Sequence, residues 1–459
     1  MVAYVKSGVA ELRDSAVFSQ IETAPPAEVR AIQTRMLRAQ LAYLQEHSDL
    51  YRVKMAEAGV EWSAIKEIED LSLVPFTVKQ DLRDSMKAVP PFGRHLAASI
   101  DAVAQMQASS GTTGSPSYVA LTESDIARWN ESSARSLFAC GIRPGDRVLH
   151  ALSLSKGFVG GLPVFQAIQY MGALDVPIGA DGGADRLLIA CRDLKPRAIL
   201  GTPNYLIYLA EIAEQTIGIT ARELGVEQLV VGGEPGGGIP AIRQQLEDLW
   251  GAKVTEMMGG TDLGVMFWAE CSHKNGMHLV APDHVLCELI QPESGEVVPF
   301  QKGAFGELVY TALERQASPV LRFRSGDHVH VTDMACPCGR TGPMIRCVGR
   351  TDDMLIVRGV NLFPSAIQDV VGELRPATSG IMRVLADFPG HSTQGNLKVL
   401  VERGESALDS DDPLLKAEVE RRVRNRLSAK IEVEIVPYES FERPGVRKVA
   451  ITIRERPAF

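Results

Sequence analysis

Short apolar runs that alternate with helical stretches constrain the fold of this chain more than any other feature of its sequence. Five runs have the length and residue types of strands: 118–121, 148–152, 174–178, 197–200 and 228–231. Strands that alternate with helices indicate mainly parallel sheets that helices cover. Ligands of such sheets bind at the carboxyl ends of the strands. We therefore expect the loops after Leu152, Val231 and Val254 to form one binding edge.

The pattern changes after residue 303, where apolar and polar residues alternate as in antiparallel strands. We expect a small β-rich subdomain over about 303–348. A charged turn at 349–353 then precedes a tail with strand-like and helical stretches of its own, at 398–401, 413–427 and 431–436. The predicted fold is α/β: an N-terminal domain, 1–350, hinged to a small, mobile α+β domain, 351–459.

Residues 109–116 combine hydroxyl side chains with two glycines, between an apolar-rich stretch and a strand-like one. Glycine lets the backbone turn so that successive N–H groups point at one position. Such a nest attracts an anion, and the hydroxyls add further donors. The stretch predicts a site for the phosphates of a nucleotide triphosphate. In isolation, a run of this kind is equally typical of a flexible polar loop.

Composition excludes several classes of function. The formal net charge of −9 argues against nucleic acid as the main partner. No apolar run is long enough to span a bilayer, and residues 1–6 lead into charged sequence without a signal-peptide core. We therefore expect a cytoplasmic protein with no membrane partner, whose seven cysteines are reduced. Cys336 and Cys338 are too close in sequence for an ordinary structural disulfide and favour a metal.

Four motifs, taken in order, resemble those of the adenylate-forming superfamily of acyl-CoA ligases and adenylation domains. Within it the chain is most similar to the phenylacetate–coenzyme A ligase family, nearly from end to end. The motifs are an N-terminal segment, a phosphate loop, an adenine-side turn and a hinge signature, at 73–84, 109–116, 232–235 and 350–365. In the first segment, we expect Thr77 to cap a short helix.

The resemblance implies a set of ATP-binding residues. Those expected to cradle the β- and γ-phosphates are Ser110, Gly111, Thr112, Thr113 and Gly114. Those expected to form the wall beside the adenine are Gly233, Glu234 and Pro235, followed by the motif that contains Met258 and Gly259.

Further roles follow from the same resemblance. Thr261 is expected to touch the α-phosphate, and Asp262 to help hold Mg²⁺, which prefers oxygen ligands. Asp327 is expected to accept the ribose hydroxyls, and Arg350 to bind ribose or phosphate nearby. Taken alone, Asp327 or Arg350 is more typical of a surface ion pair. Asp352 is expected to be the hinge between the two domains, and Gly359 to lie in the wall of a tunnel for the pantetheine arm of coenzyme A.

The chain departs from the family pattern at three places. Ser115 and Ser117 occupy the region where the phosphate loop normally carries a lysine. Met258 replaces a tyrosine, and Asp262 a longer glutamate. Val446 stands where the lysine of the adenylation step is expected, and Lys448, two residues on, is the candidate replacement.

A second group of residues suggests zinc. Three thiolates and one imidazole make a tetrahedral structural site. Cys336 and Cys338 provide one half, and Cys271 with His278, or alternatively His273, the other; relatives carry a comparable set. Free buried cysteines and a surface histidine are the alternative.

The loop after the strand at 148–152 is expected to shape the acyl pocket through Lys156, Phe158, Gly160 and Gly161. The resemblance implies an ATP- and Mg²⁺-dependent ligase that joins an aryl or arylacetic acid to coenzyme A through an acyl-adenylate. Two alternatives stay open. One is the same fold with another acceptor, such as a carrier-protein thiol or an amine, or with acyl transfer from a CoA thioester. The other is a protein that binds nucleotide or acyl-CoA without turnover. Relatives also imply a homodimer.

Overall fold

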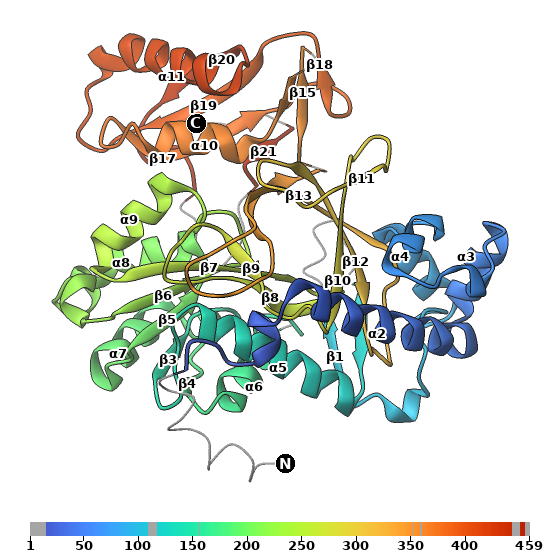
Figure 1. Ribbon diagram of the computed structural model, residues 1–459. Helices are drawn as coiled ribbons and strands as arrows, with labels where there is room; N and C mark the ends of the chain where they lie inside the picture. The colour runs from blue at the N-terminus through green and yellow to red at the C-terminus, as the bar shows by residue number, and fades with distance from the viewer. Residues whose placement is uncertain are drawn as a thin grey trace.

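The computed structural model describes residues 15–108, 117–155, 157–351, 353–358, 360–442 and 450–454. These residues form a large body with a smaller C-terminal body above it (Figure 1). Both bodies combine helices with sheets, as the α/β prediction requires. Among the helices described, none has the length and apolar character needed to cross a membrane.

One half of the main sheet is parallel. Its strands are β3 (Arg147–His150), β4 (Leu174–Val176), β5 (Ala198–Gly201), β6 (Gln228–Val231) and β7 (Lys253–Gly260). They lie in the order β4-β3-β5-β6-β7, and every neighbouring pair is parallel. The helices and turns around them are α5 (Glu123–Ala139), α6 (Leu162–Tyr170), η5 (Ala180–Gly182), α7 (Ala184–Leu194), α8 (Pro203–Ile217), η6 (Ala221–Leu224) and α9 (Pro240–Trp250).

The two faces of the parallel half are buried under different helices. Leu206 of α8 and Trp250 of α9 belong to one apolar core, together with residues of α7. Phe138 of α5 and Ile168 of α6 belong to the core on the opposite face. Because both faces are covered, most residues of these strands are apolar, without the alternation of a half-exposed sheet.

The remaining strands of this sheet are antiparallel. They are β8 (Gly264–Glu270), β9 (Met277–Leu279), β10 (Val285–Ile290), β11 (Val297–Val298), β12 (Phe305–Ala312), β13 (Phe323–Asp333) and β14 (Met344–Arg350). Only residues 261–263 separate β7 from β8, and so short a connection permits only antiparallel pairing. The expectation of mainly parallel sheets therefore holds for β3–β7 alone. The strands over 303–348 are antiparallel as expected, but β14 pairs with β9, so they continue the large sheet.

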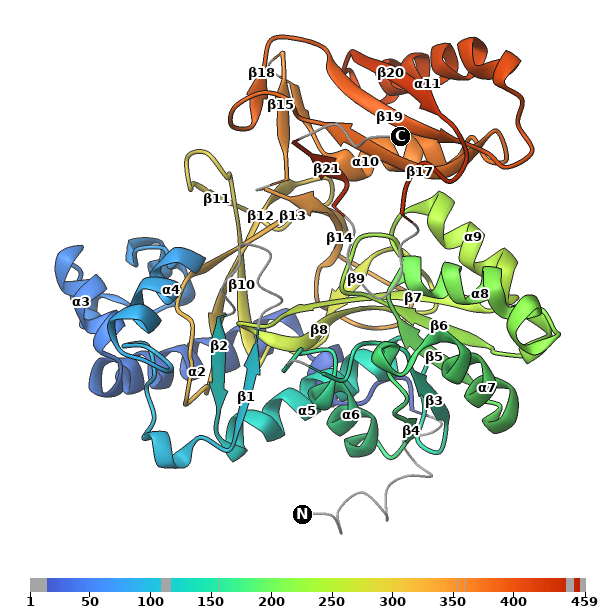
Figure 2. The same ribbon diagram turned by 180° about the vertical axis from the view of Figure 1, so that it is seen from behind.

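The N-terminal part of the chain is helical and flanks the sheet. Its elements are η1 (Gln20–Thr23), α2 (Pro26–His47), α3 (Asp49–Glu57), η2 (Trp62–Ala64), η3 (Ile68–Leu73), α4 (Lys79–Ala88) and η4 (Ile100–Ala102). Leu37 and Leu44 of α2 are buried in one core with Leu286 of β10. The antiparallel pair β1 (Gln105–Ala108) and β2 (Tyr118–Leu121) lies between these helices and the parallel half (Figure 2).

The C-terminal body has its own core and two small sheets. The first contains β15 (Leu355–Val357), β16 (Val360–Leu362) and β18 (Ser392–Thr393), and the second β17 (Thr378–Leu385), β19 (Leu397–Arg403), β20 (Ile431–Val436) and β21 (Thr452–Ile453). Its helices are α10 (Pro364–Gly372), η7 (Asp409–Asp411) and α11 (Asp412–Leu427). The strands and helix predicted in the tail are thus present as β19, β20 and α11. The domain boundary at residue 350 stays a prediction.

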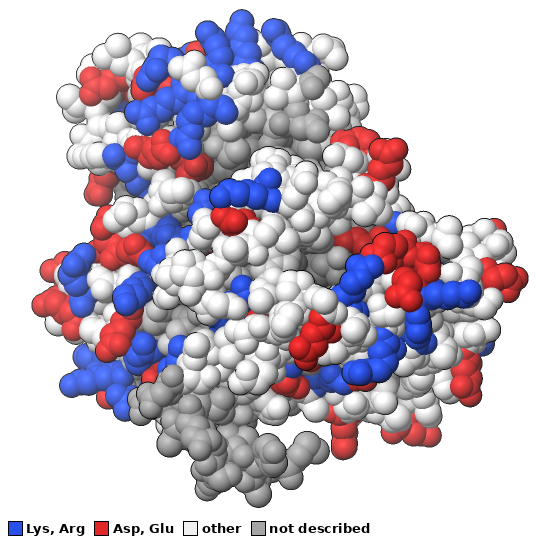
Figure 3. All heavy atoms as spheres, viewed as in Figure 1, with Lys and Arg blue, Asp and Glu red and all other residues white. Residues whose placement is uncertain are grey.

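Basic side chains gather on the C-terminal body, where α11 lies (Figure 3). Several of them are ion-paired within the body. Arg421 and Arg422 each contact Glu418 at 2.7 Å, and Arg426 contacts Glu373 at 2.6 Å. These pairs compensate much of the positive charge.

Candidate functional site

The loops after β3, β6 and β7 share one edge of the parallel half. In the register of the sheet, His150 is opposite Leu200, and Val231 is opposite both Gly201 and Glu256. The carboxyl ends of these strands therefore meet, as expected for a binding edge. One detail of the prediction is wrong: β7 continues to Gly260, so the third loop begins at residue 261 and not after Val254. The longer strand pairs with β8 beyond the end of β6.

The adenine-side turn lies directly beside the Met258 motif. A Cβ added at Gly232 would be 2.7 Å from the carbonyl oxygen of Met257, so only glycine fits there. Gly233 has a φ of 83°, which glycine adopts without strain. Glu234 accepts a hydrogen bond from the backbone N–H of Asn204 at 3.0 Å, which fixes the turn to the start of α8.

The second motif is equally constrained by backbone packing. A Cβ at Gly259 would lie 2.0 Å from the carbonyl oxygen of Val265, a contact that no side chain tolerates. The half-buried Met258 pairs with Trp268 across the β7–β8 hairpin. Thr261 and Asp262 form the turn of this hairpin, at the binding edge.

The carboxylate of Asp262 is held by a lysine that sequence reasoning missed. Lys79 Nζ lies 2.7 Å from Oδ1 and 2.6 Å from Oδ2 of Asp262, and both side chains are largely buried. Lys79 belongs to the N-terminal segment 73–84, whose resemblance to the family was the available signal. Sequence reasoning assigned that segment no chemistry because its partner is 183 residues away.

Backbone pairing of segment 73–84 brings Lys79 to this edge. The N–H of Thr77 donates to the carbonyl of Arg322 at 2.9 Å, and the N–H of Arg324 donates to the carbonyl of Thr77 at 2.9 Å. The prediction that Thr77 caps a helix is wrong. Its hydroxyl donates to the Leu321 carbonyl at 2.7 Å, and the Asp81 carboxylate accepts from the N–H at the start of α4 instead.

The two residues predicted to bind ribose contact each other. Asp327 and Arg350 are paired across β13 and β14, and Arg350 Nη1 lies 3.3 Å from Asp327 Oδ1. A Cβ at Gly326 would lie 2.8 Å from Arg350 Nη2, so glycine lets the guanidinium approach the backbone. Gly326 also donates to the buried Glu307 carboxylate at 3.2 Å. These contacts therefore fix the turn that carries the part-exposed carboxylate of Asp327.

Two links join this ribose region to the carboxyl edge of the sheet. Leu263, next to Asp262, packs against a small apolar core that contains Phe323, at the start of β13. Burial raises the pKa of the Cys347 thiol, and the charges of Asp327 and Glu256 raise it further. The Cys347 thiol is therefore close enough to Asp327 of β13 and Glu256 of β7 to interact with both.

Several predicted site residues lie outside the described part of the chain: Ser110, Gly111, Thr112, Thr113, Gly114, Lys156, Asp352, Gly359 and Lys448. Their roles stay predictions. One contact locates the start of the phosphate loop. Ala108, its preceding residue, donates from its N–H to the Gly157 carbonyl at 2.7 Å. The strand β1, which precedes the phosphate loop in the sequence, therefore ends directly beside the predicted acyl-pocket loop.

The acyl-pocket loop is closely packed on itself. A Cβ at Gly160 would lie 2.4 Å from Cε1 of Phe158, and one at Gly161 would lie 2.9 Å from the Ser153 carbonyl oxygen. The ring of Phe158 therefore lies directly against Gly160. Phe158 also packs against two apolar cores, so part of its surface serves the fold, as the alternative interpretation anticipated.

A buried pair of carboxyl groups near the adenine-side turn was not expected. Burial and the neighbouring Glu270 raise the pKa of Glu256 to about 7, against hydrogen bonding from Gly238. Glu270 is fully buried and accepts from Arg243 at 2.6 Å and from the N–H of Glu256 at 3.0 Å. In the sequence, these two glutamates stand among the mostly apolar residues of β7 and β8, so no local pattern predicted that they would pair.

The predicted metal ligands come together. One ligand atom each from Cys271, His278, Cys336 and Cys338 lies within 4.8 Å of all the others. The Sγ atoms of Cys271 and Cys336 are 3.6 Å apart, and Cys338 Sγ is 3.5 Å from His278 Nε2. In a tetrahedral site with Zn–S bonds of about 2.3 Å, sulfurs are about 3.8 Å apart, so the donors fit zinc. His278, and not the alternative His273, belongs to this cluster.

Family models for AMP-binding enzymes match most of the chain. The AMP-binding enzyme model matches residues 5–312, and the model of the AMP-binding enzyme C-terminal domain matches residues 359–453. The phenylacetate–coenzyme A ligase of Thermus thermophilus is 35% identical over 91% of this chain and 94% of its own. That of Aromatoleum evansii is 31% identical over 95% of this chain and 97% of its own.

A solved 2-hydroxyisobutyryl-CoA ligase shares the whole architecture. Its structure in the postadenylation state, with 2-HIB-AMP, is 31% identical and superposes with a TM-score of 0.88 over 96% of this chain and 93% of that chain. In the thioesterification state, with CoA and the adenylate, the TM-score is 0.70, over 96% and 92%. The two bodies of this chain are thus arranged more nearly as in the postadenylation state.

These matches agree with the geometry. The motifs that the family shares fall on the carboxyl edge of the parallel half and on the adjoining β13–β14 turn. Adenylate-forming ligases use ATP and CoA to convert a carboxylic acid into its thioester. This chain belongs to the AMP-binding enzyme family and is an AMP-forming acid–thiol ligase that acts through an acyl-adenylate.

Proposed function

We propose that this ligase activates an aryl or arylacetic acid. The observation that carries the proposal is the ring of Phe158 against Gly160, in the loop after β3. An aromatic side chain beside glycines leaves a flat, apolar surface that suits an aromatic ring. The two relatives described above, both named for phenylacetate, support the same class of acid.

The first half-reaction needs positive charge at the α-phosphate. A carboxylate oxygen of the acid attacks the α-phosphorus, and the bond to the bridging oxygen breaks so that pyrophosphate leaves with the electron pair. Asp262 offers two oxygens to a cation, and these are the donors that Mg²⁺ prefers. Mg²⁺ bound there would supply charge neutralisation for the leaving group.

Lys79 supports this step in our proposal. Its ammonium group already lies at the Asp262 carboxylate, where a bound cation and the polyphosphate of ATP are expected. It would therefore provide a positioned cation in a chain whose phosphate loop has no lysine. Asp327 and Arg350 would hold the ribose by hydrogen bonds, and positioning of this kind accounts for much of the rate in phosphoryl chemistry.

In the second half-reaction, the thiol sulfur of CoA attacks the acyl carbonyl and AMP leaves. The C-terminal body is expected to turn about Asp352 and to present Gly359 to the pantetheine arm. The cluster of Cys271, His278, Cys336 and Cys338 would hold a structural Zn²⁺, since four protein ligands leave no open position for substrate.

The test is release of AMP and pyrophosphate with a panel of acids, with and without CoA. The panel contains benzoate, phenylacetate, hydroxyphenylacetate and 2-hydroxyisobutyrate. Aryl acids are expected to give the highest kcat/KM, with AMP release that depends on CoA. Preference for 2-hydroxyisobutyrate, the acid named for the solved ligase, contradicts the aryl proposal and supports a small hydroxy acid.

The same assay separates the alternatives for the acceptor. Pyrophosphate release that does not lead to AMP release on addition of CoA indicates an acceptor such as a carrier-protein thiol or an amine. Binding of ATP without pyrophosphate release for any acid indicates a binding protein.

A further inference from the structure

A buried histidine–aspartate pair lies beneath the acyl-pocket loop. His150, the last residue of β3, is fully buried, and Asp175 of the neighbouring β4 has a side chain that is 1% exposed. His150 Nδ1 lies 3.5 Å from Asp175 Oδ2. Neither carboxylate oxygen of Asp175 has a hydrogen-bond partner of standard geometry in the described part of the chain. Burying such a polar pair costs free energy of folding, so its presence indicates a structural or functional role.

The other nitrogen of the same ring reaches the acyl-pocket loop. His150 Nε2 is 2.7 Å from the carbonyl oxygen of Gly160, so this nitrogen carries a proton and donates it. The opposite nitrogen of the ring, Nδ1, faces the Asp175 carboxylate at 3.5 Å. Asp175 thereby orients the ring, and the ring holds the carbonyl of Gly160.

The opposite end of this loop is also anchored from the segment that follows β4. Asp181 of η5 accepts from Ser153 Oγ at 2.7 Å and from the N–H groups of Leu154 and Ser155 at 2.9 and 3.1 Å. Burial by itself would raise the pKa of Asp181, but these hydrogen bonds lower it below its usual value and keep the carboxylate charged. The loop is therefore fixed at both ends, while Phe158 and Gly160 lie close to the His150 end.

We propose that His150 and Asp175 are positioning residues for the acid: they fix the Gly160 carbonyl and, through it, the place of Phe158 in the acyl pocket. The inference deepens the proposed function and rests on its placement of the acyl pocket. The residues expected to bind ATP and CoA lie on other loops, so we expect the pair to act mainly on the acid.

Two amide substitutions of different reach test this role. In His150→Gln the amide nitrogen takes the place of Nε2 and keeps the bond to Gly160. In His150→Asn it takes the place of Nδ1, keeps the contact with Asp175 and loses Gly160. Both variants retain a polar side chain in the buried site, which protects the fold. We expect the KM for the acid to rise about tenfold in His150→Asn, as for the loss of one hydrogen bond, and about threefold in His150→Gln, which keeps Gly160 but loses the orienting contact with Asp175.

The matched control is Asp146→Asn. Asp146 is a buried aspartate at the opposite end of β3, paired with Arg197 at 2.7 Å and remote from the acyl loop. It is expected to lower stability and to leave the KM for the acid unchanged. In all variants, the KM for ATP and CoA is expected to stay within twofold. Equal acid KM values for the Gln and Asn variants, or a parallel rise in the KM for ATP, overturn the proposal.

Hydrogen exchange provides a readout that needs no substrate. Peptides that cover 157–164 are expected to exchange faster in His150→Asn than in His150→Gln or Asp146→Asn. If the acid panel identifies a non-aromatic substrate, the aryl proposal fails, and the KM comparison is made with that acid. Unchanged exchange in all variants overturns the positioning role whatever the substrate is.

Discussion

In our proposal, Lys79 supplies a cation that the family's missing lysines would otherwise provide. The phosphate loop lacks its lysine and Val446 replaces the later one, yet a lysine from α4 contacts the Asp262 carboxylate. We expect Lys79→Ala to slow acyl-adenylate formation about a hundredfold, because a preorganised cation at developing charge is worth about 3 kcal/mol. Thioester formation from supplied adenylate is expected to keep its rate. Pyrophosphate release and single-turnover CoA assays measure the two steps separately.

Lys54 offers a matched control for this substitution. Lys54 of α3 pairs with the carboxylate of Asp81 on α4 at 2.6 Å, away from the binding edge. Lys54→Ala is expected to leave both half-reactions within threefold of the parent. An equal loss in both half-reactions for Lys79→Ala contradicts a role in adenylation.

Glu256 predicts a pH dependence of stability. Its pKa is about 7 in the folded chain and 4.5 as a free group, because burial and Glu270 disfavour the charge. The stability that the neutral form contributes is fully present below pH 4.5 and is lost as the pH rises through 7. Compared with Glu256→Gln, the parent is expected to lose about 2–3 kcal/mol between pH 5 and pH 8.5.

Urea unfolding of both proteins at the two pH values measures this difference. Glu28→Gln, at an exposed position of α2, is the control and is expected to follow the parent. A parent and a Glu256→Gln variant with parallel pH profiles contradict the raised pKa.

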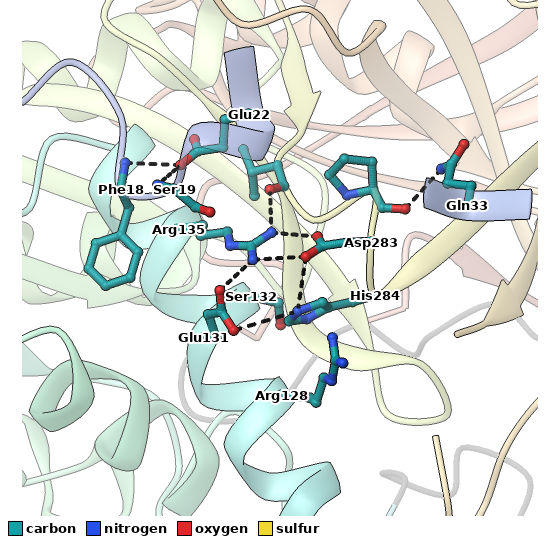
Figure 4. A network of polar contacts seen from close by, with 12 residues as sticks. Phe18, Ser19, Glu22, Gln33, Arg128, Glu131, Ser132, Arg135, Asp283 and His284 are labelled. Carbon is teal, nitrogen blue, oxygen red and sulfur yellow. Dashed lines mark hydrogen bonds and ion pairs between the residues drawn. The ribbon is translucent and has the colours of Figure 1, made fainter. Parts of the chain in front are cut away.

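At the scale of elements, a buried ion network attaches α5 to the strands around it. Arg135 of α5 is fully buried and contacts Glu131 and both oxygens of Asp283, at 2.6 and 3.1 Å for the latter (Figure 4). Burial by itself would raise the pKa of Asp283, but the Arg135 guanidinium keeps this pKa below its usual value. The bonds therefore fix the helix to the segment that leads into β10.

Removing the cation from this network is expected to be costly. Arg135→Leu leaves the buried Asp283 carboxylate without its counter-charge, and such losses cost about 3–5 kcal/mol. Arg421→Ala, which removes an exposed pair on α11, is expected to leave the urea midpoint nearly unchanged, because solvent screens such a pair. Urea midpoints measure both. A loss for Arg135→Leu as small as that for Arg421→Ala contradicts the argument.

The connection between β13 and β14 contains two residues of the cysteine–histidine cluster, and we expect its stability to depend on that cluster. Next to Cys338, Arg340 pairs with the buried Glu22 at 2.8 Å, which ties the N-terminal η1 to this connection. We expect the purified chain to contain about one zinc per chain by elemental analysis, and Cys338→Ser to lose it with a fall of several degrees in Tm. Cys191→Ser, a buried cysteine outside the cluster, is expected to keep the metal. Zinc-free parent protein with an unchanged Tm contradicts the site.

At the scale of the whole molecule, the contact between the two bodies defines one state of a cycle. Gly372 of α10 lies against Ala241 of α9, with 3.1 Å between the Cβ of Ala241 and a Cβ built at Gly372. Nearby, Arg375 donates to the Gln245 side chain. The arrangement matches the postadenylation state of the solved ligase far better than its thioesterification state. The contact must therefore break if this chain follows the same cycle.

A reversible crosslink tests that expectation. In Ala241→Cys with Gly372→Cys, the two Cβ atoms need to move by only a few tenths of an ångström to reach disulfide distance. The oxidised double variant is expected to form adenylate at the parent rate and to lose thioester formation more than tenfold, with recovery after reduction. The single variants, oxidised in parallel, control for the other cysteines. Full thioester formation by the oxidised protein contradicts the required movement.

The sequence by itself determined the elements and the residue types of the site. Apolar runs predicted β3, β5 and β6, and the resemblance of its motifs to the family implied which turns would bind the nucleotide. It also predicted all four residues of the cysteine–histidine cluster. The strands depend on neighbours within a few positions, which local periodicity controls, whereas the resemblance joined the two distant halves of the cluster.

Only the tertiary structure decided which side chains become partners. Lys79 contacts Asp262, Arg350 contacts Asp327, and His150 joins Asp175 to the acyl loop across two strands. The antiparallel strands also extend the main sheet, although their sequence alone suggested a separate unit. Such pairings join residues far apart in the chain, and they form because burial forces polar groups to find partners wherever packing places them.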